Sequence, residues 1–175
     1  EVWGRIKTVL GKVAATTTRD PVKAISFSSL GEAMVPVTAG RAIVGPSLLC
    51  IDARGAEYVE RLRAVLPDER LYAINGNTLG NNYGLTKLMW LRDHRPDVYR
   101  AADRFLHWGS FAAFMLGADP IVDYSLANRT LLFDIERCDW SDELLGLTGL
   151  ERRKLPATTA TGTVVGTMAA DIARE

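Results

Sequence analysis

The sequence is poor in residues that commonly bind metals or form disulfides. Its 175 residues include two cysteines and two histidines. Cys50 and Cys138 lie far apart, and neither has a CxxC partner or a neighbouring histidine. This spacing indicates neither a zinc site nor a disulfide framework, and we expect no protein metal ligands. A reducing, cytoplasmic location fits the pattern best.

The sequence also lacks an excess of charge and long apolar runs. Lys and Arg number 21, as do Asp and Glu, so the formal net charge is zero. No long-range field therefore attracts nucleic acid or an anionic membrane, and we expect neither as a partner. No apolar run reaches about eighteen residues, and no leader pattern predicts a membrane span or secretory signal. The chain opens on Glu1 without a Met, which indicates a trimmed chain.

The short catalytic motifs with well-understood mechanics are absent. We find no Walker loop, no GxGxxG opening a helix, no HExxH and no GxSxG. His107 lies in the apolar stretch "FLHWG", which favours a buried, hydrogen-bonded ring over a catalytic base because no orienting partner is visible nearby. His94, in "DHRP", is expected at a solvated helix end.

The composition is that of one globular domain, with 47% hydrophobic and 24% charged residues. Helical periodicity predicts a first helix that begins near Val2 and ends before the threonines at 16–18, and which packs on another element. Further helices are expected after Gly55, from Thr86, near 98–102, over 108–117 and after an N-cap at Ser141. Strands are expected at 22–29, 33–38, 42–51, 104–108 and within 155–166. This order predicts an α/β or α+β fold with a mixed sheet.

Two stretches are expected to interrupt the helices and strands. "PDER" should end the helix that follows Gly55, and "NGNTLGNNYG" (75–84) reads as a loop because Asn and Gly tolerate positive φ.

Polar residues gather in three places where a strand gives way to a loop, which is a common position for ligand contacts in α/β folds. They are Gly31 with Glu32, Asp52 with Arg54, and Asp123 with Tyr124. Carboxylates accept hydrogen bonds in pairs, and glycine allows close approach of the backbone. Together these groups suit a ligand with many hydroxyls.

Each cluster also has a purely structural interpretation. Asp52 and Arg54 could simply pair with each other and cap the helix after Gly55. Asp123 could cap the turn that follows it. Glu32 lies between a glycine and an apolar run, so it is harder to explain as a solvated residue, and it stays a candidate.

The order of several motifs resembles one family. "SSLGEAMVPV", "SLLCIDARG", "GLTKLMWLRDHRPDVYRAADRFLHWGSFAAFMLG", "VDYSLANRTLLFDIERCDWSDELL" and "LPATTATGTVVG" follow one another along almost the whole chain. This order is similar to the middle of the N-terminal domain of the FGGY carbohydrate kinases. The resemblance implies a ribonuclease H-like, actin-like ATPase fold with a mixed sheet flanked by helices. It also implies that residues 1–175 form one incomplete domain, without the first Asp-x-Gly-Thr phosphate-binding hairpin and the C-terminal ATP-binding domain. Without that hairpin a sheet edge is left unpaired, so we expect self-association as a homodimer, or partial disorder near the 75–84 loop.

The resemblance also implies roles for individual residues near the first strand. Glu32 matches the acid that binds substrate hydroxyls in glycerol kinase, and Gly31 stands where that enzyme has an arginine, which argues against glycerol as substrate. Cys50 stands where many members place a tryptophan against the substrate, so a differently shaped pocket floor is expected.

Asp52 and Arg54 match the family's D-x-R pair, and Asp123 and Tyr124 match its Asp-Tyr beside the sugar. The aspartate that serves as general base in the family follows the "GTVVG" strand and lies outside this sequence, so no catalytic residue is assigned.

Two functions follow as hypotheses. In the first, the chain is the sugar-binding part of a carbohydrate kinase that uses ATP and Mg²⁺ to phosphorylate a hydroxyl of a small sugar or polyol. In the second, it is a non-catalytic sugar-binding or assembly module that retains the kinase fold.

Overall fold

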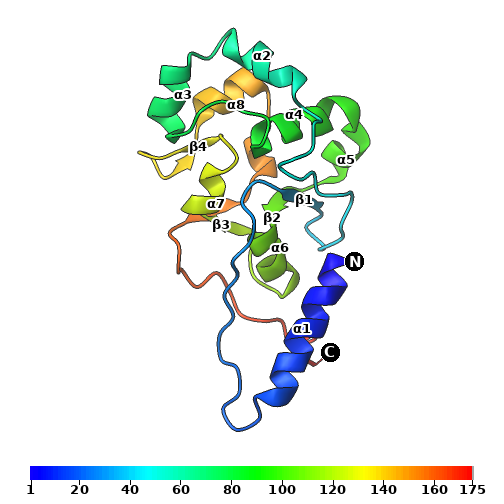
Figure 1. Ribbon diagram of the computed structural model, residues 1–175. Helices are drawn as coiled ribbons and strands as arrows, with labels where there is room; N and C mark the ends of the chain where they lie inside the picture. Colours follow the sequence, from blue (N-terminus) through cyan, green and yellow to red (C-terminus); the bar gives the residue numbers. More distant parts are fainter. Residues whose placement is uncertain (175) are drawn as a thin grey trace.

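The computed structural model describes residues 1–174. The molecule is elongated, and its helices and strands are distributed along its length (Figure 1). The helices are α1 (Val2–Thr16), α2 (Glu57–Arg63), α3 (Asp68–Asn75), α4 (Gly84–His94), α5 (Pro96–Ala101), α6 (Trp108–Met115), α7 (Tyr124–Asn128) and α8 (Asp142–Thr148), with short 3-10 helices η1 (Arg152–Lys154) and η2 (Ile172–Arg174). The strands are β1 (Met34–Val37), β2 (Arg104–His107), β3 (Ile121–Asp123), β4 (Phe133–Asp134), β5 (Asp139–Trp140) and β6 (Ala157–Thr159).

The strands pair two by two in both senses. β1 runs antiparallel to β2, with Met34 opposite His107, and β4 runs antiparallel to β5. β3 runs parallel to β6, with Asp123 opposite Thr159. Parallel and antiparallel pairs surrounded by helices confirm the expected α/β class, although the pairs form separate two-stranded ladders.

β1 is buried on both of its faces and so joins two hydrophobic clusters. Met34 belongs to a large cluster that extends through α2, α3, α4, α5 and α8. Val35 and Val37 point the other way and pack with Leu106 of β2 and Phe111 of α6. Because successive strand residues face opposite sides, a fully apolar strand such as β1 belongs between two layers.

The strands expected at 22–29 and 42–51 are wrong. Residues 21–30 contain no strand and are mostly exposed, with Val22 48% and Ile25 39% exposed. In the second segment, only Ile43 and Leu48 form isolated bridges to β1. β-branched composition does not make a strand by itself, because a ladder also needs a neighbouring backbone to receive its hydrogen bonds.

α1 confirms the predicted helix but packs less than expected. None of its residues is buried, and Val9 is 59% exposed. Trp3 packs against the smaller cluster, and its ring lies edge-on to that of Phe111, with the ring centroids 6.3 Å apart. In Figure 1, α1 (blue) lies apart from the strands and from the helices of the large cluster.

Two features were missed where turn residues dominate the sequence. The helix after Gly55 ends at Arg63, before "PDER" as expected, but the proline also starts the unpredicted α3, because Pro67 has a φ of −58° at the N-cap and Asp68 and Glu69 follow in the first turn. The β4–β5 hairpin closes because Asp134 Oδ1 accepts hydrogen bonds from two backbone amides, and Cys138 adopts a φ of 53°. α4 also begins at Gly84, two residues before the expected Thr86.

The turn before α2 depends on a glycine. Gly55 has a φ of 92°, and a Cβ at this position would lie 2.6 Å from the carbonyl oxygen of Thr86 in α4. Only glycine adopts this conformation readily while the backbone of α4 approaches so closely.

We expect Gly55→Ala to lower the free energy of unfolding by about 2–4 kcal/mol, because it adds backbone strain to a clash with rigid backbone. Thermal or urea unfolding of the intact protein measures the change. Gly146→Ala is the matched control: nothing lies within 4 Å of its Cβ position in α8, so it should stabilise by about 0.5–1 kcal/mol. Equal stability of the two variants would contradict this account of the turn.

Candidate functional site

Glu32 lies just before β1 and forms an ion pair with Arg129, which follows α7. Both Nε and Nη2 of Arg129 donate to the same carboxylate oxygen, Oε1, with the Nε bond at 2.9 Å. The Glu32 side chain is 16% exposed and that of Arg129 is 32% exposed. Burial acts to lower the pKa of Arg129, but the hydrogen bonds and charge of Glu32 outweigh it and raise that pKa. Arg129 is therefore protonated at neutral pH, and the pair is half-buried.

Gly31 makes room for this arginine. A Cβ at position 31 would lie 2.8 Å from Cγ of Arg129, so the alkyl part of Arg129 occupies the space that a side chain at position 31 would need. On its other side, the guanidinium lies over the ring of Tyr83, 4.7 Å from the ring centroid. Stacking on an aromatic face restricts the orientation of the guanidinium.

The 75–84 loop supports Arg129 through a network of amides. Asn77 Oδ1 accepts from Arg129 Nη1 at 3.4 Å, and Asn77 Nδ2 donates to Asn128 Oδ1 at 2.6 Å. Asn75 is buried and donates to the carbonyl of Phe133 at 2.9 Å. The loop that the sequence predicts is present over 76–83, and its asparagines tie it to α7.

Asp123 occupies the N-cap of α7, as its structural interpretation proposed. Its Oδ1 accepts hydrogen bonds from the backbone amides of Ser125 and Leu126, and from the hydroxyls of Ser125 and Thr161. Burial acts to raise the pKa of Asp123, but these hydrogen bonds together lower it. Asp123 is therefore ionised at neutral pH.

Asp52 and Arg54 pair with each other, as the structural interpretation of this cluster also proposed. Both oxygens of Asp52 accept from the Arg54 guanidinium, and the Arg54 side chain lies over the Trp90 ring at 5.0 Å. Hydrogen bonds from Arg54 lower the pKa of Asp52 to about 2. The helix N-cap is Ala56, so Asp52 does not cap α2.

Lys87 of α4 holds the loop that contains Asp52 and Arg54. Lys87 is 4% exposed, and its Nζ donates to the carbonyl oxygens of Asp52 and Arg54, the latter at 2.8 Å. Burial lowers its pKa, and the nearby charge of Asp52 acts in the opposite direction. Cys50 lies in the same loop as a half-buried free thiol.

The seven predicted residues thus fall into two groups. Gly31, Glu32, Asp123 and Tyr124 lie around α7, whereas Cys50, Asp52 and Arg54 lie beside the first turns of α4. Among the described residues, no hydrogen bond or ion pair joins one group directly to the other. They are connected through α4, since the amides of Gly84 and Leu85 donate to the carbonyls of Arg129 and Thr130.

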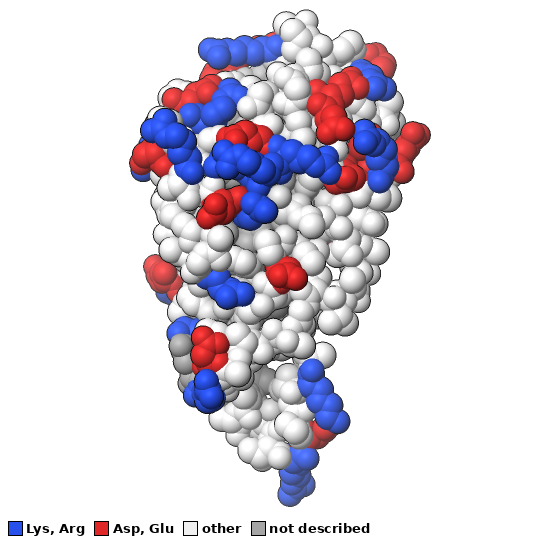
Figure 2. Space-filling view, turned by 180° about the vertical axis from the view of Figure 1, so that it is seen from behind, with Lys and Arg blue, Asp and Glu red and all other residues white. Residues whose placement is uncertain are grey.

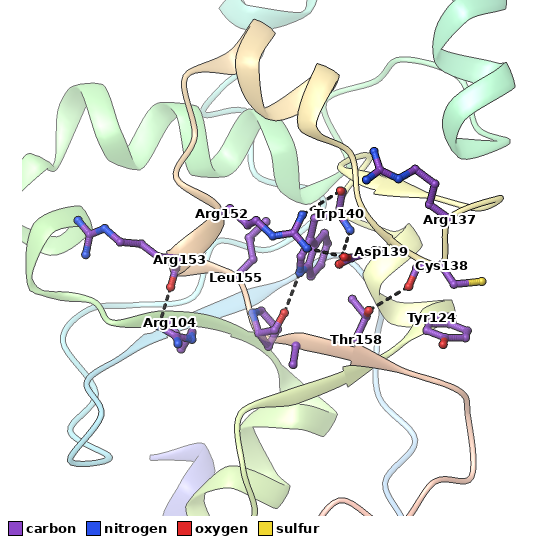
Figure 3. Close-up of a pocket in the computed structure, with 12 residues that line it drawn as sticks. Arg104, Tyr124, Arg137, Cys138, Asp139, Trp140, Arg152, Arg153, Leu155 and Thr158 are labelled. Carbon is purple, nitrogen blue, oxygen red and sulfur yellow. Dashed lines mark hydrogen bonds and ion pairs between the residues drawn. The ribbon is translucent and has the colours of Figure 1, made fainter.

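A shallow hollow of about 790 Å³ lies beside β5, η1 and β6, and Tyr124 is the one predicted residue that lines it. Figure 3 shows its walls braced by hydrogen bonds from Trp140 Nε1 to the carbonyl of Pro156 and from Thr158 to that of Cys138. Arg152 is held by Asp139 on the same wall. From behind, basic and acidic side chains are intermingled rather than gathered into a patch of one sign (Figure 2).

His107 is fully buried at the end of β2, and burial lowers its pKa to about 4. Neither ring nitrogen has a hydrogen-bond partner in residues 1–174, so the expected burial is confirmed and the expected hydrogen bond is wrong. The ring is neutral at pH 7. His94 is exposed at the end of α4, as expected, and its ring also stacks on Trp90.

Sequence reasoning missed Arg129, Asn77 and Lys87. A signal existed for Lys87, because a lysine inside the apolar face of "LTKLMW" needs a partner when the helix is buried. Arg129 in "ANRT" gave no such signal, since its partner is 97 residues away.

Comparison of the backbone with solved structures defines the class. The chain superposes on a xylulose kinase from Rhodospirillum rubrum with a TM-score of 0.89 at 23% identity, covering 98% of this chain and 36% of that one. A gluconate kinase from Lactobacillus acidophilus gives a TM-score of 0.84 at 18% identity, with 98% and 36% covered. The fold is therefore that of the sugar kinases, the actin-like ATPase fold, as predicted.

Sequence comparison then defines the family. Residues 1–175 match the N-terminal domain of the FGGY family of carbohydrate kinases, and the chain belongs to this family. The autoinducer-2 kinase of Salmonella typhimurium is 32% identical over 166 residues, covering 92% of this chain and 30% of the relative. The xylulose kinase of Escherichia coli is 26% identical over 153 residues, covering 87% and 31%. The chain thus spans about a third of the length of these relatives.

We expect the buried His107 to make stability depend on pH. Because burial lowers its pKa from 6.5 to about 4, the unfolded chain takes up a proton between these values while the folded protein does not. Stability is therefore highest above pH 6.5 and is lost as the pH falls towards 4. Between pH 7 and pH 5 the free energy of unfolding should fall by about 2 kcal/mol from this residue alone.

Urea unfolding at the two pH values tests this expectation. The variant His107→Leu should lose most of the fall, whereas His94→Gln, which changes the exposed histidine, should retain it. A full fall in His107→Leu would assign the pH dependence to other groups.

Proposed function

We propose that the intact protein is an ATP-dependent carbohydrate kinase, and that residues 1–175 supply part of its sugar-binding side. The family to which the chain belongs supports this proposal. So does the kind of site that its carboxylates form. In this proposal the chain is the central part of the N-terminal domain, and the first phosphate-binding hairpin and the ATP-binding domain belong to the rest of the protein.

The observation that carries the proposal is the unequal use of carboxylate oxygens. The protein occupies Oε1 of Glu32 and Oδ1 of Asp123, whereas no residue within 1–174 donates to Oε2 of Glu32 or to Oδ2 of Asp123. In Asp52, by contrast, Arg54 occupies both oxygens. Glu32 and Asp123 therefore each keep an acceptor for a substrate hydroxyl, and Asp52 does not.

Each of the other residues has a role consistent with this arrangement. Tyr124 adjoins Asp123 and packs on Phe133, so its ring would form a wall beside the sugar. Gly31 leaves space that Arg129 fills beside Glu32, and Cys50 would present a small side chain at the pocket floor. Asp52 and Arg54 fix the loop that carries them and Cys50. They would affect sugar binding only through the position of that loop.

The reaction would form a bond between a substrate hydroxyl oxygen and the γ-phosphorus of ATP. The bond from that phosphorus to the β–γ bridging oxygen breaks, ADP leaves, and the hydroxyl proton passes to a base. Mg²⁺ would neutralise phosphate charge when bound. The residues described here, 1–174, include no group of three acidic, His or Cys side chains placed to hold a metal ion, and we assign them no ligand of Mg-ATP.

A small sugar or polyol is the only partner that the proposal requires. Both cysteines are free thiols, which agrees with a cytoplasmic location. Of the helices in residues 1–174, none has the length and apolar character needed to span a membrane. The homodimer stays a prediction.

The proposal predicts sugar-dependent ADP release by the intact protein in Mg-ATP, assayed over a panel of ketoses, aldonates and polyols. With the best substrate, Glu32→Gln and Asp123→Asn should each lower kcat/KM about 10- to 100-fold, because each weakens a charged hydrogen-bond acceptor. Asp139→Asn, on the hollow beside β5, should change it less than about threefold.

The absence of turnover with every sugar, by a folded protein, would move the assignment to a non-catalytic sugar-binding or assembly module. Equal effects of all three substitutions would show that the open carboxylate oxygens are not the substrate acceptors.

A further inference from the structure

We propose that Arg129 is a positioning residue for substrate recognition, which holds Glu32 with one carboxylate oxygen turned to the ligand, and that Gly31 is present to make this possible. The inference rests on the proposed function, because it concerns the same sugar site. It adds a residue that neither the motifs nor the family resemblance assigned.

The Glu32–Arg129 ion pair uses one carboxylate oxygen, as the exposed Arg153–Glu151 pair also does, but unlike the Arg70–Glu143 pair. Arg70 binds Glu143 with Nε on one oxygen and Nη2 on the other, so both oxygens are occupied. Arg129 instead places both donors on Oε1 of Glu32. An arginine fork usually matches the two oxygens of a carboxylate. The one-sided arrangement keeps Oε2 open to a hydroxyl donor.

Several contacts hold Arg129 in this orientation. The Tyr83 ring lies against one side of the guanidinium, and Asn77 accepts a hydrogen bond from Nη1. The amide of Gly84 donates to the backbone carbonyl of Arg129 at 3.3 Å. The arginine is thus held by three residues of the 75–84 segment, and its own alkyl chain packs over Gly31.

Gly31 and Arg129 are therefore a coupled pair. A Cβ at position 31 would meet Cγ of Arg129 at 2.8 Å, so a larger residue at 31 requires a shift of the backbone or of the Arg129 side chain that contacts Glu32. The ligand class that this pair favours is a neutral polyhydroxyl compound, because the acceptor that it orients is a carboxylate oxygen.

The first test compares Arg129→Ala, Arg129→Lys and the control Arg70→Ala in the intact protein. A misplaced Glu32 weakens binding of the substrate more than the chemical step. We therefore expect KM to rise about tenfold or more in Arg129→Ala, with kcat changed less than about threefold. Arg129→Lys, which keeps the charge, should recover part of the loss. Arg70→Ala should leave KM within about twofold.

The second test uses Gly31→Ala and does not require the arginine to be removed. Gly31→Ala alone should raise KM about as much as Arg129→Ala. In the Arg129→Ala background, where Cγ is gone, the same change should add less than about twofold. Likewise, Arg129→Ala should add little to Glu32→Gln. Additive effects in either cycle, or an unchanged KM in Gly31→Ala, would overturn the inference.

Calorimetric titration of each variant with the same sugars, in the absence of ATP, separates this inference from the proposed function. Sugar binding without turnover, weakened in the same pattern, would refute the kinase and support the role of Arg129. Turnover with a KM that is unchanged by the substitutions at Arg129 and Gly31 would support the kinase and refute the role of Arg129. If the protein shows neither sugar binding nor turnover, both the proposed function and the role of Arg129 are overturned.

Discussion

The ion pair between Glu32 and Arg129 joins the segment before β1 to the end of α7, across 97 positions in the chain. Each charge is mostly removed from solvent, so either one alone would be costly. The pair therefore forces the two segments to lie side by side. The charges at the two caps of α7 suit this position. The N-cap Asp123 is acidic and the C-cap Arg129 is basic, which is the order that the helix dipole favours.

The start of α4 extends this constraint to the second group of polar residues. Its first amides bind the carbonyls of Arg129 and Thr130, and Lys87, one turn later, binds the carbonyls of Asp52 and Arg54. One short helical segment thus sets the position of two loops that are distant in sequence. The close approach at Gly55 is a consequence, because the loop must lie almost in contact with the backbone of α4.

The candidate site depends on which carboxylate oxygens accept hydrogen bonds from the protein and which do not. A carboxylate whose two oxygens both face protein donors, such as Asp52, serves the structure. Glu32 and Asp123 are each fixed through a single oxygen, so the same contacts that make them rigid leave an acceptor for a ligand. Rigid carboxylates with open oxygens bind hydroxyls at a low cost in side-chain entropy.

By itself, the sequence determined the family and the helices α1, α2, α4, α5, α6 and α8, because motif order and helical periodicity are local properties. Of the three polar clusters expected at strand ends, only Asp123 lies at the end of a strand. The sequence could not determine which carboxylates face the protein and which keep an open oxygen. It also did not predict α3 or the unpaired segment at 21–30, since proline starts as well as ends helices and a strand exists only beside a partner. The tertiary structure decided that Arg129 meets Glu32 over Gly31, because that contact depends on the packing of segments that the chain separates by almost a hundred residues.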